Sequence, residues 1–283
     1  MLRIFLTIMV GVVLVAMIAG YLFNRKYRAQ IAAAEILWEE ISESAAPSPK
    51  FDLNMIDGMP EIGQLYFRHA IAVGTPLSKV VELSMSGEFM LGEKGATKVF
   101  AMEARQILRG PDAFVWMPLL TSGPMVMTGV DSFWDGHGVT QFWLQGLIPL
   151  VQEADTLDIN RSAAVRPAIE AVWVPASLLP QNGANWEQTG VDTAAITFDN
   201  DPFDVRVELK LAADGAVQEI WAMRWSNANP DKIFQMQPFG GLVHGEATFG
   251  GFTIPSHIEV GNNFGSDAYF PFFIATLNSV EYW

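Results

Sequence analysis

A run of twenty uncharged residues near the start of the chain, residues 4–23, constrains the fold more than any other feature. Arg3 precedes the run, and Arg25, Lys26 and Arg28 follow it. An α-helix rises about 1.5 Å per residue, so a helix of this length spans the roughly 30 Å hydrocarbon layer of a bilayer. The sequence therefore predicts a single-pass anchor at residues 1–28, with residues 4–23 in contact with the lipid bilayer.

A cleaved signal peptide is the alternative interpretation of this run. Signal peptides have an apolar region of about 7 to 15 residues, followed by small residues at the cleavage site. Here the run is longer and basic residues follow it, so an uncleaved anchor in the cell membrane is favoured. The cations after the run outnumber Arg3 and the amino terminus by one, a margin that leaves the side of the membrane open.

Residues 29–50 link the anchor to the rest of the chain. Alanine and glutamate are abundant up to Glu43, and both favour helix, so a helical stalk is expected. Pro47 and Pro49 then break the helix and form a short spacer. Residues 51–283 are expected to form a single globular domain, long enough to bury about 70% of the surface of its unfolded chain.

The domain is strongly acidic and contains no cysteine. From residue 51 onward there are 12 basic and 27 acidic residues, a net charge of −15. Such a domain repels phosphate backbones and anionic lipid surfaces, so nucleic acid is not an expected partner. The lack of cysteine excludes disulfides, thiolate metal sites and a cysteine nucleophile.

Periodicity in the domain predicts mostly strands. One helix is expected between Pro60 and Gly74, and a second over residues 161–173, with Asn160 or Ser162 as its cap and Pro167 as a shortening or kinking residue. Alternating apolar and polar residues with short turns between them indicate antiparallel strands. The clearest are residues 81–91, 98–108, 114–120, 125–134, 139–144, 205–211 and 217–226. Further candidates are residues 233–237, 242–249 and 252–260, and residues 269–283 are rich in aromatic and β-branched residues. We predict an α+β, mainly antiparallel β domain of eight to ten strands, a curved sheet or half-barrel with two helices packed on it.

Few residues suggest chemistry, and no cofactor is expected. The chain has no glycine-rich phosphate loop, dinucleotide fingerprint or nucleophile-elbow serine. Asp131, Asp135 and His137 lie close enough in sequence to hold a divalent cation or to act as general acid and base. The favoured interpretation is structural, with Asp135 in a hairpin turn and Asp131 on the solvent side of a strand.

Two further groups of polar residues have ordinary structural interpretations. His244 and Glu246 are two residues apart on an expected strand and would form a surface pair. Glu153, Asp155 and Asp158 precede the second helix, where acidic residues suit the helix dipole, and they lack the spacing of a calcium loop.

Large apolar side chains are unusually common, with nine tryptophans, nineteen phenylalanines and thirteen methionines. In residues 217–226 they fall on both faces of one expected strand, which indicates either an ordinary core or the wall of a cavity. The candidate residues for lining such a cavity and binding an apolar ligand are Trp116, Trp134, Trp143, Trp221, Met223 and Trp225.

Several segments resemble an uncharacterised bacterial family known only as a domain of unknown function. They include residues 67–70 (Phe-Arg-His-Ala), 74–77 (Gly-Thr-Pro-Leu), 85–88 (Met-Ser-Gly-Glu), 158–164 and 170–180, and the similarity covers most of residues 63–261. Pro167 departs from the family pattern. The resemblance implies no catalytic residues. By analogy of outline it suggests the half-barrels of lipoprotein carriers, although fold alone does not give function.

The leading hypothesis is a membrane-tethered, non-catalytic domain that binds a lipid, an acyl chain or a membrane protein partner. A hydrolase or isomerase that uses scattered carboxylates and His137 is the first alternative. The second is a structural accessory subunit held against a larger membrane complex by residues 4–23.

Overall fold

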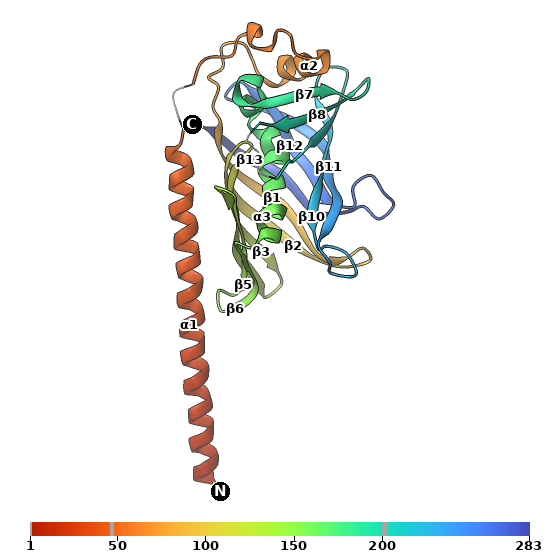
Figure 1. Cartoon of the computed structure of the whole chain (residues 1–283). Coiled ribbons are helices and arrows are strands. Elements are labelled where there is room, and N and C mark those ends of the chain that lie inside the picture. Colours follow the sequence, from red (N-terminus) through yellow and green to blue (C-terminus); the bar gives the residue numbers. More distant parts are fainter. Residues whose placement is uncertain (1, 46–47, 200–202) are drawn as a thin grey trace.

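The computed structural model describes residues 2–45, 48–199 and 203–283. Pro47 of the expected spacer lies outside the described residues. Thirteen strands form one antiparallel sheet in the order β6-β5-β4-β3-β2-β1-β13-β12-β11-β10-β9-β8-β7, strongly curved as Figure 1 shows. Their bounds are β1 Val80–Glu93, β2 Ala96–Arg109, β3 Ala113–Ser122, β4 Met125–Trp134, β5 His137–Leu144, β6 Ile148–Ala154, β7 Ala184–Gln188, β8 Thr193–Phe198, β9 Val207–Leu211, β10 Val217–Ser226, β11 Gln235–Phe249, β12 Phe252–Asn262 and β13 Phe270–Tyr282.

The sheet consists of two meanders joined where the domain begins and ends. Strands β1 to β6 pair in sequence order, as do β7 to β13, and β1 pairs with β13. In that junction Val81 lies opposite Tyr282, and Phe89 lies opposite Phe273. Curvature of the joined sheet creates a concave face and a convex face. The predicted curved antiparallel sheet is therefore confirmed.

The strand count exceeds the predicted eight to ten. Strand β6 was not expected because Pro149 and Glu153 interrupt its apolar pattern. Residues 233–237 and 242–249 were expected as separate strands, since proline and glycine lie between them. They belong to one strand, β11, in which Pro238 pairs with Met223 and Gly240 with Trp221. Sheet pairing across the chain overrides these local breaking signals.

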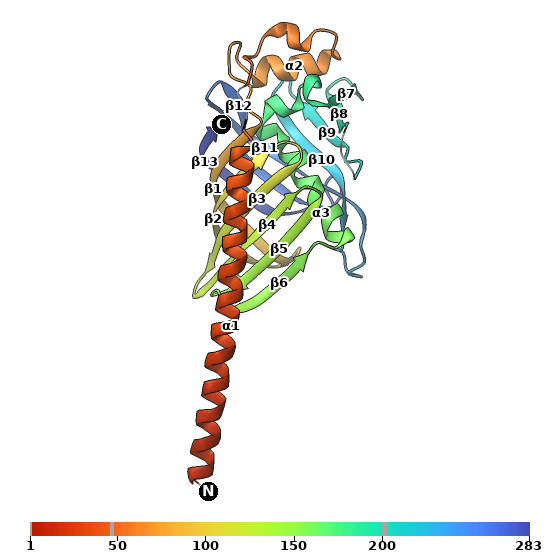
Figure 2. The same cartoon turned by 60° about the vertical axis from the view of Figure 1, so that its left-hand side comes forward.

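Helix α3 (Leu157–Ile169) lies on the concave face, where it contacts β5 of one meander and β10 of the other, as Figures 1 and 2 show. Close approach to β5 requires Gly138, since a Cβ atom there would lie 2.8 Å from the Cβ of Ala163. The predicted start at residue 161 was wrong. Thr156 caps the helix earlier, its hydroxyl accepting a hydrogen bond from the amide of Ile159 at 3.2 Å.

Pro167 lies inside α3. The helix ends two residues later and continues as three short 3₁₀ segments, η2 Glu170–Trp173, η3 Pro175–Leu178 and η4 Pro180–Asn182. At the end of the sheet farthest from the N-terminus, α2 (Glu61–Ala70) and η1 (Leu53–Ile56) cover the strand ends. This helix falls within the predicted interval between Pro60 and Gly74.

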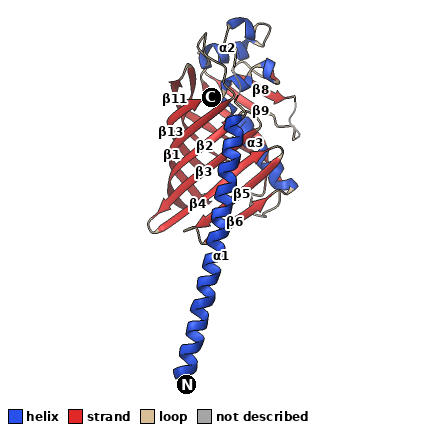
Figure 3. Cartoon of the chain, turned by 90° about the vertical axis from the view of Figure 1, so that its left-hand side faces the viewer, coloured by secondary structure: helices blue, strands red, loops and turns tan. Residues whose placement is uncertain are grey.

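A single 42-residue helix, α1 (Leu2–Glu43), runs from the N-terminus onto the convex face of the sheet. Its first half projects beyond the sheet, whereas its second half lies along β2, β3 and β4, as Figure 3 shows. Trp38 and Ile41 are 7% and 0% exposed and pack with Val115. The stalk expected after the anchor is helical up to Glu43, and it docks on the sheet.

The described residues contain one helix that is long and apolar enough, by length and composition, to cross a membrane. It covers Arg3–Glu43, and its most apolar window has no buried side chains. Within the described residues, no side chain of this apolar window is buried, in contrast to the docked half, where Trp38 and Ile41 are buried.

Candidate functional site

A cavity of about 220 Å³ lies between the concave face of the sheet and the segment formed by α3 and η2. Its walls are mostly aromatic and aliphatic, whereas four charged side chains from β4, α3, η2 and β10 gather on one side. The lining residues on which the site depends are Phe89, Trp116, Asp131, Phe142, Arg166, Glu170, Arg224, Phe239, Val260, Phe272 and Phe273.

Trp116 of β3 is the centre of the aromatic wall. Its ring centroid lies 6.0 Å from Phe89, 6.2 Å from Phe142 and 6.0 Å from Phe273. The side chain is only 3% exposed, yet its indole Nε1 has no hydrogen-bond partner. Buried indole N–H groups usually find an acceptor, so this donor, on a residue that lines the cavity, is an exception.

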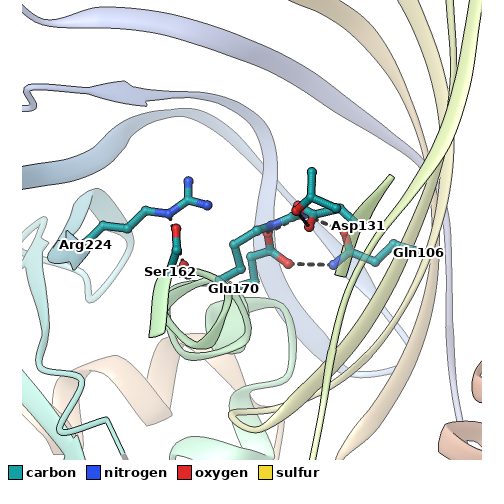
Figure 4. A network of polar contacts seen from close by, with 7 residues as sticks. Gln106, Asp131, Ser162, Glu170 and Arg224 are labelled. Carbon is teal, nitrogen blue, oxygen red and sulfur yellow. Dashed lines mark hydrogen bonds and ion pairs between the residues drawn. The ribbon is translucent and has the colours of Figure 1, made fainter. Parts of the chain in front are cut away.

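Arg166 of α3 forms the centre of a charged network beside the aromatic wall, shown in Figure 4. Its guanidinium donates to Asp131 Oδ2 at 2.7 Å and to Glu170 Oε1 at 2.8 Å. Gln106, which is fully buried, donates through Nε2 to Glu170 Oε2 at 2.7 Å. Thr140 donates its hydroxyl to Asp131 Oδ1 at 2.8 Å. Both carboxylates thereby have a cation and a neutral donor.

The network keeps Arg166 charged although it is buried. Burial alone lowers the pKa of Arg166, but the neighbouring carboxylates of Glu170 and Asp131 outweigh burial and raise that pKa above its usual value. The guanidinium carbon also lies 4.3 Å from the ring of Phe114. Arg166 is therefore a fixed cation whose donors are used within the protein.

Arg224 of β10 is a second cation beside the cavity, and its environment differs. Its Nε donates to the backbone oxygen of Ser162 at 3.1 Å, and its guanidinium carbon lies 4.8 Å from the ring of Phe239. Among the described residues no carboxylate forms an ion pair with it. Burial lowers the pKa of Arg224, and Arg166 adds to this effect, while Asp131 and Glu170 oppose it.

Comparison with protein families then identifies the chain. Residues 49–274 match the profile of DUF6544, a family of unknown function. The chain belongs to the DUF6544 family. The resemblance to a family of unknown function is thus confirmed. Comparison with curated proteins gives no match.

Solved structures with a similar arrangement are distant in sequence. A DUF1329 family protein from Desulfovibrio piger is 8% identical, with 72% of this chain and 86% of that chain covered and a TM-score of 0.41. A LolA superfamily protein from Nitrosomonas europaea is 10% identical, with 78% of this chain and 92% of that chain covered and a TM-score of 0.37.

In this DUF6544 member only Trp116, among the six residues proposed from the sequence to bind a ligand, lines the cavity. Trp134 and Trp143 lie on the convex side, where Trp134 stacks under Arg109 and Trp143 contacts Tyr27 of α1. Their strands alternate, so only every second side chain faces inward.

The three candidates from β10 also lie away from the cavity. Trp221 stacks on Phe264, Trp225 stacks on Phe234, and Met223 is 46% exposed. The opposite face of the strand, with Ile220 and Arg224, is the one that lines the cavity. The face of β10 that carries Trp221 and Met223 is thus the one away from the cavity, and Trp225 donates to Asp158 of α3.

Asp131 was expected on the solvent side of its strand, and this expectation was wrong. Its side chain is 15% exposed and pairs with Arg166, because β4 directs it to the concave face. Asp135 and Gly136 form the turn as expected, with φ angles of 50° and 82°. His137 pairs instead with Asp155 at 2.5 Å on the surface. Within the described ranges, no group of three or more metal-ligating side chains occurs.

The remaining polar pairs also have different partners from those expected. A bulge around Gly245 separates His244 from Glu246. Glu246 pairs with His69 at 2.7 Å, and His244 lies 3.3 Å from Glu259. Of the acidic cluster before α3, Glu153 is exposed on β6, Asp155 binds His137, and Asp158 accepts a hydrogen bond from the indole of Trp225 at 2.7 Å.

Sequence reasoning missed Arg166, Glu170 and Arg224 as cavity residues, and it missed Gln106 as a member of the network beside the cavity. Two signals were available. Arg166 stands in an alanine-rich helical segment and is four residues from Glu170, a spacing that allows an ion pair. Arg224 alternates in phase with Ile220 and Ala222, and a cation on the apolar face of a strand indicates a buried charge.

Proposed function

We propose that this chain is a membrane-tethered, non-catalytic domain that binds an apolar ligand of the acyl-chain class in its concave cavity. The observation that supports this function is the cavity itself, whose wall is built from Trp116, Phe142, Phe272 and other apolar side chains. Ligand pockets are mostly apolar with a few placed polar groups, and this cavity has that composition. Flat aromatic rings suit the methylene groups of an acyl chain.

The tether is the apolar half of α1, and a second apolar surface supports contact with the membrane. Where the uncharged run ends, Asn24 donates to the backbone oxygen of Gly146 at 3.4 Å, in the turn between β5 and β6. Beside that turn Leu147, Ile148 and Leu150 are 44%, 55% and 47% exposed. Figure 2 shows this hairpin at the end of the sheet nearest the projecting half of α1. We infer that the hairpin touches the bilayer interface.

Photolabelling of the full chain tests the ligand-binding proposal. The protein is placed in lipid nanodiscs with a diazirine-bearing stearic acid, irradiated, and mapped by peptide mass spectrometry. We expect labelled peptides from β3, β5 and β13, which carry Trp116, Phe142 and Phe272. Val260→Trp fills the cavity and should abolish this labelling. Met223→Trp adds the same side chain on the outer face and should leave it unchanged.

Equal labelling of the wild type and of the Val260→Trp variant would contradict the proposal. It would favour instead an accessory subunit that is held in a membrane complex by α1 and binds no ligand in the cavity. The hydrolase or isomerase alternative loses its geometric basis, because Asp131 is held by Arg166 whereas His137 lies on the surface with Asp155.

A further inference from the structure

Two hydrogen-bond donors on the wall of the cavity have no acceptor within the protein. One is the indole Nε1 of Trp116, which is buried. The other is the guanidinium of Arg224, whose only hydrogen bond to a described residue is made by Nε to the oxygen of Ser162. Arg224 is only partly buried, whereas a buried indole donor without an acceptor is rare in proteins. Together, this donor and a cation without a carboxylate partner on the same cavity point to an acceptor that the described residues do not provide.

The carboxylates nearby are not that acceptor. Asp131 and Glu170 both bind Arg166, and the neutral donors Thr140 and Gln106 complete their hydrogen bonds. Glu259, which also lines the cavity, lies 3.3 Å from His244. Each acidic group at the cavity therefore has a partner of its own, and Arg224 is the cation left without one.

Position and environment favour an anion at Arg224. Its Nε contacts Ser162 in the first half of α3, and Figure 4 shows Arg224 apart from Asp131, Glu170 and Gln106. The ring of Phe239 lies on one side at 4.8 Å, and the charges of Arg166, Asp131 and Glu170 also act on Arg224. An oxyanion would relieve the cost of burying the charge of Arg224, and guanidinium groups bind carboxylates and phosphates in bidentate geometry.

We propose that Arg224 and the indole N–H of Trp116 bind the oxyanion head of an amphipathic ligand whose acyl chain lies along the aromatic wall. This inference rests on the proposed function and names the ligand class, an acyl chain ending in a carboxylate or a phosphate. The carboxylate of a free fatty acid and the phosphate of a phospholipid share the required chemistry.

Competition against the photoreactive stearic acid tests the inference in the full chain. Oleate, oleyl alcohol and dioleoyl phosphatidic acid are each added to the nanodiscs at the same mole fraction. In the wild type we expect oleate or the phosphatidic acid to compete about 10-fold to 100-fold better than the alcohol, as expected for charge-assisted hydrogen bonds. Which of the two anions competes better distinguishes the fatty acid from the phospholipid.

Two variants assign this preference to the named donors. Arg224→Gln should reduce the advantage of the anion to less than about threefold. Arg161→Gln is the matched control, because Arg161 lies 4.4 Å over the ring of Trp225 and does not line the cavity. Trp116→Phe keeps an aromatic ring but removes the N–H donor and part of the indole, so it should weaken anion competition without abolishing labelling. It also provides a readout if Arg224→Gln fails to fold.

Equal competition by oleate, phosphatidic acid and oleyl alcohol in the wild type would overturn the head-group inference while the proposed function stands. An anion preference that survives both Arg224→Gln and Trp116→Phe would overturn the assignment to these residues. Failure of all three competitors would instead count against the proposed function.

Discussion

Two buried tryptophans on opposite faces of the sheet, Trp143 and Trp116, have contrasting environments. Trp143 on the convex face is 1% exposed, and its Nε1 donates to Gln30 of α1 at 2.7 Å. Trp116 on the concave face is 3% exposed and has no acceptor. The indole donor on the convex face is therefore satisfied within the chain, whereas the indole donor on the concave face is unused.

Arginines on the two faces repeat this contrast. On the convex face Arg105 forms an ion pair with Glu35 of α1, and its guanidinium carbon lies 4.6 Å from the ring of Trp38. On the concave face Arg224 has a backbone carbonyl and an aromatic ring but no carboxylate. The convex face thus holds α1, and the contrast supports the proposal that the concave face binds a molecule from outside the chain.

Removal of Arg166 should have the largest effect on stability. Arg166→Met leaves Asp131 and Glu170 buried without their cation, which should cost about 3–5 kcal/mol of unfolding free energy. Thermal and urea unfolding of the full chain in detergent, followed by tryptophan fluorescence, measures the loss. Arg166→Met combined with Asp131→Asn and Glu170→Gln should recover part of it. No recovery would mean that packing of the arginine, and not its charge, matters.

Truncation of the docked half of α1 tests the convex interface. Ile41→Ala removes a fully buried side chain and should cost about 2–5 kcal/mol. Ile36→Ala, at a position that is 59% exposed on the same helix, is the control and should change stability little. Neither variant should alter photolabelling of the cavity. Altered labelling by Ile41→Ala would show that the two faces are coupled.

The two tryptophans allow a matched comparison of the two faces. Trp143→Phe and Trp116→Phe remove the same atoms, but only the first breaks a hydrogen bond, that to Gln30. Trp143→Phe should therefore be more destabilising by about 1 kcal/mol, measured by the same unfolding assay. Equal losses would contradict the inference that the Trp116 donor is unused in the ligand-free protein.

The surface pair of His137 and Asp155 should have the smallest effect. The hydrogen bond and the charge of Asp155 raise the pKa of His137 above 6.5, and the same contact lowers the pKa of Asp155 below 3.8. The histidine contribution is complete below pH 6.5 and is lost as the pH rises through its folded pKa. The aspartate contribution is present above pH 3.8 and is lost as the pH falls through its folded pKa.

Asp155→Asn should return the pKa of His137 toward 6.5, which NMR titration of the histidine ring measures. The asparagine tolerates the φ angle of 50° at this position, so the turn should persist. An unchanged pKa of His137 would show that the pair does not form in solution.

Local pattern was sufficient to predict much of the sheet. The expected strand 125–134 coincides with β4, and the strand 252–260 differs from β12 only at its end. Strand β6 was not predicted because Pro149 and Glu153 interrupt its alternation of apolar and polar residues. The start of α3 was predicted too late because Thr156, and not a later residue, caps the helix. Asp131 shows why the site could not be predicted from the pattern. Alternation places its side chain on the opposite face from its neighbours in the strand but does not indicate which face is concave.

By itself, the sequence determined the apolar half of α1, the hairpins and the alternation of most strands, because these depend on residues close together in the chain. The tertiary structure decided that α1 docks on the sheet, that α3 lies on the concave face, and that Trp116, Arg166 and Arg224 meet at one cavity. Period-two alternation gives each strand two faces but does not determine which face lies on the concave side of the sheet. The concave face forms only when β1 pairs with β13, as between Ser84 and Ser279, which are 195 residues apart in the chain.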